Sequence, residues 1–201
     1  MVLLASAVLL TGCMSGERPT LISEPPGGAV NNDPVINAVL DRLALADGVT
    51  FTAAYTITPT TTGVATNATV RQQGTKRRIT IGDVDFLTDA GASQTCDNID
   101  GTCVGFIDDA RVSNLNITHR FWGGSFADRL KLDASRNLRA ATGQVETIAG
   151  HPASCTDVTV VGGTLIYCAL DAGVLARYIG ADVSIELTSF SLQVEPSELT
   201  R

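Results

Sequence analysis

The stretch from Val49 to Thr58 alternates strictly between two kinds of side chain. Its odd positions, from Val49 to Ile57, are apolar, and its even positions, from Thr50 to Thr58, are threonine or alanine. Successive side chains of a β-strand point to opposite faces of the sheet, so this pattern predicts a strand with one buried face. Such a strand needs neighbours, and the chain must therefore build its core on a sheet.

Further strands are predicted in two series, which are separated by a middle region without strand alternation. Turn residues separate the first strand from three short successors, which together form an antiparallel meander over residues 49–58, 64–73, 76–81 and 84–88. A second series follows Gly143 over residues 144–148, 153–161, 164–170, 174–178 and 182–194. In the last of these the apolar residues change parity near Thr188-Ser189, which predicts a β-bulge there.

Two helices are predicted beside these strands. The first begins at Pro34, with Asn32 or Asp33 as its N-cap, carries an apolar face at i, i+3, i+4 and i+7 and ends before Gly48. The second runs from Phe126 to about Ala141, with Ser125 as its N-cap. The whole pattern predicts an α+β fold dominated by one antiparallel sheet.

The amino terminus carries an export signal. Val2 to Leu10 form an apolar run that is too short to span a bilayer, which needs about 20 apolar residues. The following Leu10-Thr11-Gly12-Cys13 resembles the bacterial lipobox, in which the cysteine is lipidated and becomes the first mature residue. No Lys or Arg precedes the run, which departs from the usual signal peptide. A buried helix with Cys13 as a core thiol is the alternative.

This interpretation divides the chain into three parts. Residues 1–12 are a signal peptide, and residues 13–32 are the lipidated cysteine and a flexible tether rich in Pro and Gly. Residues 33–201 form a single domain. We expect a lipoprotein held in the cell membrane by acyl chains such as palmitate, with its domain on the extracytoplasmic side.

The remaining cysteines support export to an oxidising compartment. The chain has five cysteines, and setting Cys13 aside leaves an even set of four. Of the three possible connectivities, we predict Cys96–Cys103 and Cys155–Cys168, because each pair is an odd number of positions apart and brackets a hairpin signal. A zinc site is the competing interpretation, but the paired Cys-x2-Cys spacing that it requires is missing.

No motif of catalysis or of cofactor binding stands out. His119 and His151 have no partner at metal-ligand spacing, and Asp97–Gly101 lacks the ligand positions of a calcium loop. Asp108-Asp109 with Arg111 is either a polar cluster near a pocket or an exposed turn. The net charge of −7 argues against nucleic acid as a partner. We expect a monomer that is not an enzyme and has neither metal nor cofactor.

A resemblance to a known superfamily adds to this interpretation. The segment Ala149-Gly150-His151-Pro152-Ala153-Ser154-Cys155, the pair Tyr167-Cys168 and the run Asp171-Ala172-Gly173-Val174-Leu175 resemble a pattern of envelope lipoproteins. With the order of helices and strands, they make the chain similar to the LolA-like superfamily of lipoprotein carriers, which includes LolA and the LppX/LprG lipoproteins. The resemblance implies a strongly curved sheet, or half-barrel, with helices on its concave face around a cavity for acyl chains.

Two functions follow as hypotheses. The first is a carrier or holder of a lipid or acylated ligand in an apolar cavity. The second is a non-enzymatic envelope interaction module with a filled core, which binds another protein through a sheet edge or the disulfide hairpin. The residues expected to line a cavity, or otherwise to fill the core, are Phe51, Tyr55, Phe86, Phe121, Trp122, Phe126 and Leu130.

Overall fold

The computed structural model describes residues 33–200. The predicted signal peptide 1–12, the lipidation site Cys13 and the tether 13–32 lie outside this range. Within the described part of the chain, no helix is long and apolar enough to cross a membrane.

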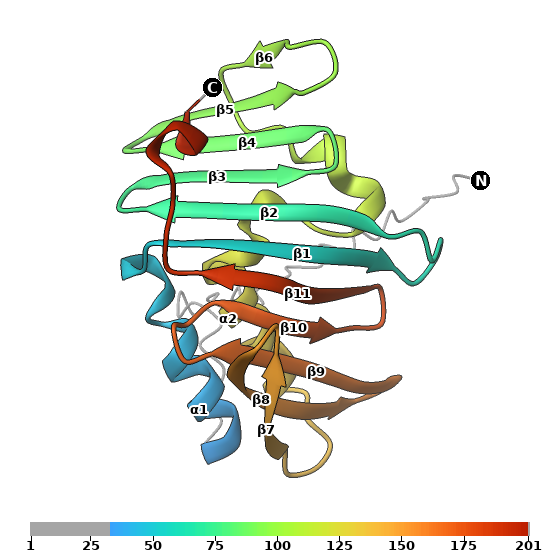
Figure 1. The fold of residues 1–201 in the computed structure, drawn as a ribbon. Helices are drawn as coiled ribbons and strands as arrows, with labels where there is room; N and C mark the ends of the chain where they lie inside the picture. Colours follow the sequence, from blue (N-terminus) through green and yellow to red (C-terminus); the bar gives the residue numbers. More distant parts are fainter. Residues whose placement is uncertain (1–32, 201) are drawn as a thin grey trace, which may run out of the picture.

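One open antiparallel sheet forms the framework, as predicted, and it has eleven strands (Figure 1). Its spatial order is β6-β5-β4-β3-β2-β1-β11-β10-β9-β8-β7, so two meanders meet where β1 pairs with β11. The first meander consists of β1 (Phe51–Pro59), β2 (Thr66–Gln73), β3 (Lys76–Ile81), β4 (Val84–Asp89), β5 (Ala92–Asp97) and β6 (Cys103–Val104). The second consists of β7 (Thr142–Ile148), β8 (His151–Val160), β9 (Gly163–Leu170), β10 (Leu175–Ile179) and β11 (Val183–Ser191).

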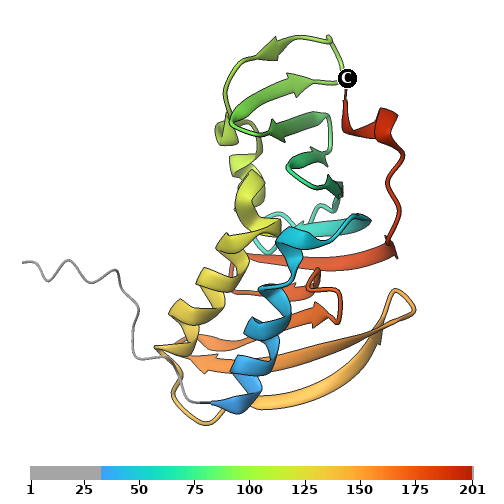
Figure 2. The same ribbon diagram turned by 90° about the vertical axis from the view of Figure 1, so that its left-hand side faces the viewer.

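The helices cover one face of this sheet, which bends around them (Figure 2). They are α1 (Pro34–Leu43), α2 (Gly124–Ala134) and the short 3-10 helices η1 (Ala46–Gly48), η2 (Asp109–Leu115) and η3 (His119–Trp122). The segment after β11 crosses the opposite, convex face and ends in η4 (Pro196–Leu199) (Figures 1 and 2). The predicted α+β fold with a curved sheet and helices on its concave face is confirmed.

The first predicted helix is confirmed, and its cap also ties it to the sheet. Asp33 is the N-cap, and its Oδ1 accepts a hydrogen bond from the Val35 backbone N–H at 2.9 Å. Its Oδ2 accepts from the Ala141 N–H at 2.9 Å, directly before β7. One carboxylate thus stabilises a free N–H group of the helix start and fixes α1 beside β7, the edge strand of the sheet.

The second predicted helix is real, but its bounds were wrong. Gly123, not Ser125, is the N-cap, and the helix ends at Ala134 instead of about Ala141. The reason is competition from the sheet. The Leu138 N–H donates to Thr159 O at 2.8 Å, and Asn137 Oδ1 accepts from the Thr159 N–H at 3.0 Å. These bonds to β8 replace the helical ones that the apolar spacing predicted.

The β1 strand and the predicted bulge both appear as expected. Residues at odd positions from Phe51 to Pro59 are buried, and those between them are half-buried. Opposite β1, Ala54 pairs with Ser189 and Tyr55 with Leu187, so Thr188 is the extra residue of a bulge. The extra residue switches the buried parity within β11. Strands β5 and β6 were not predicted from the sequence.

Both predicted disulfides are present. Cys96–Cys103 joins opposed positions of β5 and β6, and Cys155–Cys168 joins opposed positions of β8 and β9. The second bond is buried within the sheet, whereas Cys103 lies at the exposed edge. Each bond staples two adjacent antiparallel strands, which is what the odd spacings required.

Candidate functional site: an aromatic cluster and the hollow beside it

The seven residues predicted to line a cavity or fill the core lie in one buried cluster on the concave face. They come from both layers: Phe51 and Tyr55 from β1, Phe86 from β4, and the others from η3 and α2. None is more than 5% exposed. The sequence therefore identified side chains that the fold does bring together, although they span residues 51 to 130.

Four rings of this cluster contact one another in series, those of Tyr55, Trp122, Phe121 and Phe126. Ring centroids are 5.7 Å apart between Tyr55 and Trp122, and 5.7 Å apart between Phe121 and Phe126. Phe126 also packs against Tyr167 at 5.3 Å. These are the separations of aromatic side chains in contact. The interior at this point is therefore occupied by the rings themselves.

Two members of the cluster escaped the sequence analysis. Tyr167 of β9 and Tyr178 of β10 are fully buried, and their ring centroids are 5.1 Å apart. Tyr178 also meets Phe121 edge-on at 5.5 Å. The signal was present as alternation, since Leu165 and Tyr167 share a parity within a predicted strand. The apolar neighbours on the other face, Ile166 and Cys168, obscured that signal.

A hollow of about 460 Å³ opens beside the cluster, where η2, η3 and the start of α2 meet. Carbon atoms make up most of its exposed lining. Of the seven predicted residues only Phe121 reaches it, so the hollow adjoins the aromatic cluster instead of running through it. Its lining residues are Asp109, Ala110, Ser113, Asn116, Ile117, Thr118, Phe121, Ser125 and Arg129.

Arg129 places a cation at the wall of this hollow. Its guanidinium lies 4.9 Å from the centroid of the Tyr178 ring, and it donates to the carboxylate of Asp182 at 2.9 and 3.1 Å. Desolvation by burial lowers the pKa of Arg129, but Tyr178 and Asp182 outweigh it, and the net pKa is raised. The charge is therefore permanent and is held over an aromatic face.

The buried phenols of the cluster are held in their neutral form. Burial raises the pKa of Tyr178 to about 12, partly opposed by Arg129. Desolvation also raises the pKa of Tyr167, whose hydroxyl donates to the Asp133 carboxylate, and that of Tyr55, whose hydroxyl donates to Leu175 O at 3.1 Å. At neutral pH the hydroxyls of Tyr167 and Tyr55 act as hydrogen-bond donors inside an apolar layer, whereas the buried hydroxyl of Tyr178 has no hydrogen-bond partner among residues 33–200.

The polar residues singled out from the sequence have structural partners. His119 Nδ1 lies 2.9 Å from Asp109 Oδ2, and its ring is 5.9 Å from Phe86. Asp108 caps η2 through the Ala110 N–H, and Arg111 forms an ion pair with Asp97.

The remaining candidate metal ligands, Asp97 and His151, also have structural partners. Asp97 Oδ1 accepts from the Ile99 N–H at 2.7 Å, which fixes the tip of the disulfide hairpin, and His151 packs edge-on against Phe190 at 5.1 Å. Among residues 33–200, no three or more His, Cys, Asp or Glu side chains gather as they would around a metal ion.

A second hollow, of about 390 Å³, lies on strands β3 to β5 beside the C-terminal segment. Polar and apolar atoms contribute about equally to its lining, which includes Lys76, Asp89, Leu199 and Thr200. It contains none of the seven predicted residues.

Comparison with known proteins supports the fold alone. No family model and no curated protein matches the chain. It is similar to MucB in the complex structure of Pseudomonas aeruginosa MucA/MucB, with a TM-score of 0.55 and 16% identity over 83% of this chain. The likeness covers 60% of the MucB chain, so this protein spans about three fifths of that relative's length.

Two weaker likenesses also occur among the solved structures. LprF from Mycobacterium bovis has a TM-score of 0.47 and 15% identity, over 84% of this chain and 97% of that one. The LolA superfamily protein NE2245 from Nitrosomonas europaea has a TM-score of 0.40 and 8% identity, over 83% and 97%.

Proposed function

We propose that this protein is a lipid-anchored envelope protein that binds a lipid or another hydrophobic ligand at the hollow beside its aromatic cluster. Cys13 holds it in the cell membrane, and the residues up to position 32 let the domain reach away from the surface. The observation that carries the proposal is a carbon-lined hollow whose wall, through Phe121, is continuous with a large aromatic layer.

The size and chemistry of the hollow suit such a ligand. A volume of about 460 Å³ falls within the range of small-molecule sites. An acyl chain that leaves water for an apolar wall gains about 0.8 kcal/mol for each buried CH2 group. Arg129 lies at the same wall and is already paired with Asp182, so a ligand with a carboxylate or phosphate at one end would have to share or displace that pair.

Two rings of the cluster are carried by a short element beside the hollow. Phe121 and Trp122 belong to a four-residue 3-10 helix that is followed directly by Gly123 and Gly124. Movement of this short helix would part the rings and leave the strands of the sheet paired. The ligand would then occupy space that the rings fill in its absence.

The alternative is a non-enzymatic envelope interaction module with a filled core. The mutual packing of the rings favours it, because a core already filled has no room for acyl chains. MucB, which shares the fold, is described in complex with MucA. On this alternative the surface of the domain, and not its interior, would contact another envelope protein.

Filling the hollow separates the two functions. Ala110 lines the hollow and is exposed, so Ala110→Trp should occupy the hollow without disturbing the core. Ala92→Trp is the matched control, because Ala92 is an exposed alanine that lines the other hollow. We expect Ala110→Trp to weaken binding of a fluorescent fatty acid at least tenfold and Ala92→Trp to leave it unchanged.

Two results would count against the ligand-binding proposal. One is an unaltered chain that does not take up the fatty acid at all, and the other is equal binding by both tryptophan variants. The anchor has a separate test, since Cys13→Ala should move the protein from the membrane fraction to the soluble fraction. Retention of that variant in the membrane would contradict the lipid anchor.

A further inference from the structure

The two edges of the open sheet differ in how they are protected. The β6 edge has only two residues, and a disulfide ties it to β5. The β7 edge runs over the seven residues from Thr142 to Ile148 at the opposite end of the sheet (Figure 1). Five of these residues are exposed, and Val145 is 75% exposed.

Three features that usually prevent a strand edge from pairing are missing from β7, although Glu146 gives it one charge and the start of α1 contacts Ala141 and Gly143. Proteins commonly protect such an edge with lysine, proline or a bulge. The sequence Thr-Gly-Gln-Val-Glu-Thr-Ile contains neither residue, and its register with β8 is continuous from Thr142 to Ile148. Within residues 33–200 the sheet ends at β7, with β8 as its neighbour.

The turn between β7 and β8 determines which backbone groups point outward. Ala149 and Gly150 have φ values of 50° and 81°, as in a two-residue hairpin turn, so Ile148 and His151 form the hydrogen-bonded pair that closes it. Hydrogen-bonded and non-hydrogen-bonded pairs alternate along an antiparallel ladder. The N–H and C=O groups of Gly143, Val145 and Thr147 therefore point away from β8.

We propose that β7 pairs antiparallel with β7 of a second copy of this chain, about a two-fold axis through Val145. In this register Val145 faces its own counterpart, and Gly143 of each copy faces Thr147 of the other. All three residues present outward groups, so each facing pair exchanges two backbone hydrogen bonds. The two sheets join into one continuous sheet across the axis.

The side chains of β7 suit a copy of themselves in this register. Glu146 is the strand's charged residue, and the two-fold axis places it opposite Gln144 of the other copy instead of another carboxylate. The two groups are compatible partners, because Gln144 Nε2 already donates to Glu146 Oε1 at 2.6 Å within one chain. Val145, the most exposed apolar side chain of the strand, becomes covered by its counterpart.

The proposed pairing differs from the monomer expected from the sequence. An edge of this length buries less surface than the roughly 1,000 Å² of a stable interface, so the association is weak and is best trapped covalently. Cα atoms of a hydrogen-bonded antiparallel pair lie about 5.5 Å apart, within the range that a disulfide spans. A cysteine on the axis should therefore link the two copies.

The test is Val145→Cys in the full-length chain, expressed in a bacterial envelope and separated on a non-reducing gel. We expect a band of twice the chain's mass that reduction removes. Val161→Cys is the control, because Val161 lies in the β8–β9 turn and is 86% exposed. Adding Thr147→Pro to Val145→Cys removes an outward N–H and should reduce the dimer band at least tenfold, while protease resistance confirms that the domain is folded.

Several results would overturn the proposal. They are the absence of a dimer band from Val145→Cys, an equally strong band from Val161→Cys, a band that survives Thr147→Pro, or a disulfide from Val145→Cys to a different protein. Fatty-acid binding is measured independently, so failure of the self-pairing and failure of the ligand proposal are distinguishable.

Discussion

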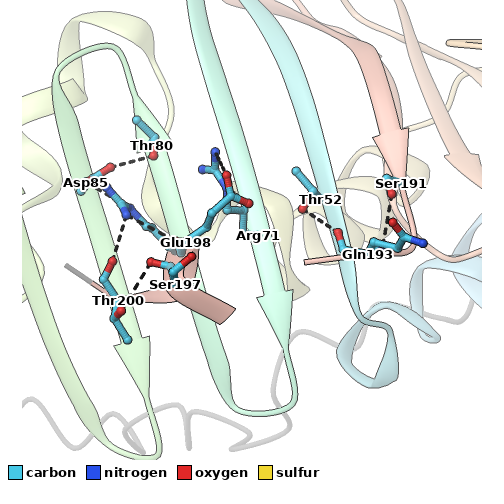
Figure 3. Close-up of polar contacts among 10 residues, drawn as sticks. Thr52, Arg71, Thr80, Asp85, Ser191, Gln193, Ser197, Glu198 and Thr200 are labelled. Atoms are coloured by element: carbon cyan, nitrogen blue, oxygen red, sulfur yellow. Dashed lines mark hydrogen bonds and ion pairs between the residues drawn. The ribbon is translucent and has the colours of Figure 1, made fainter. Parts of the chain in front are cut away.

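Asp85 carries the strongest prediction about stability, because it is a fully buried carboxylate at the junction of the sheet and the C-terminal segment (Figure 3). It accepts hydrogen bonds from Arg78 at 2.5 and 3.1 Å and from the Thr80 hydroxyl at 2.7 Å. Arg78 in turn donates to the backbone carbonyls of Glu198 and Thr200 at 3.3 and 3.1 Å. One ion pair thus joins β3, β4 and the end of the chain.

Asp85→Ala leaves the guanidinium of Arg78 without its carboxylate partner. Loss of one member of a buried pair costs about 3–5 kcal/mol of unfolding free energy. The side chain of Arg78 is 20% exposed and keeps two carbonyl partners, so we expect a loss near the lower end, at about 3 kcal/mol. Urea denaturation followed by circular dichroism measures this loss.

Asp128→Ala is the matched control. Asp128 pairs with Lys131 at 3.2 Å, but the two side chains are 70% and 61% exposed, so the change should cost less than about 1 kcal/mol. Equal losses for Asp85→Ala and Asp128→Ala would refute the argument.

Burial raises the pKa of Asp85, but Arg78 and Thr80 outweigh it and lower the net pKa. The unaltered chain should therefore exceed Asp85→Ala in unfolding free energy at pH values above the ordinary carboxyl pKa of about 3.9. This difference is lost as the pH falls through the lowered pKa of Asp85.

Three further predictions follow from the core. Leu130→Ala removes a fully buried side chain and should cost about 2–5 kcal/mol in urea denaturation, whereas the half-exposed Leu132→Ala should cost much less. Replacing Cys155 and Cys168 by alanine should cost about 3 kcal/mol, and equal denaturation midpoints with and without the bond would contradict this. Tyr178 has its pKa raised from 10.0 to about 12, so its contribution to stability is complete below pH 10 and is lost as the pH rises through 12. Absorbance of tyrosinate should appear near pH 10 in the unfolded chain but only at higher pH in the folded chain.

The framework of the fold could be predicted because its signals are local. The alternation of β1 and the parity switch at Thr188 each reflect neighbouring residues, and both proved correct. The disulfides followed from odd spacings within hairpins. The second helix was predicted too long, because the bonds of Asn137 and Leu138 to Thr159 depend on a strand about 20 residues further along the chain.

The site was predictable only in its apolar part. Burial of the aromatic side chains follows from their pattern, and all seven predicted residues joined one cluster. Whether rings leave a space or fill it depends on their packing across layers, which periodicity does not encode. Arg129 was missed for a related reason, since its partner Asp182 and the ring of Tyr178 come from distant parts of the chain.

The edge strand proposed for self-pairing illustrates the same limit. Residues 144–148 were predicted as a strand, but the sequence did not indicate which strands would end the sheet. Only the spatial order places β7 at a seven-residue edge and β6 at a short, disulfide-bonded one.

Native mass spectrometry tests the proposed function most directly. The chain is expressed from Ser15 onward, without Cys13, in a host that makes abundant lipid, and is transferred intact to the gas phase. We expect a population with the added mass of a lipid or fatty acid, and a smaller such population for Ala110→Trp. Protein that carries no lipid and takes up none from added fatty acid would contradict the ligand-binding function and favour the filled-core alternative.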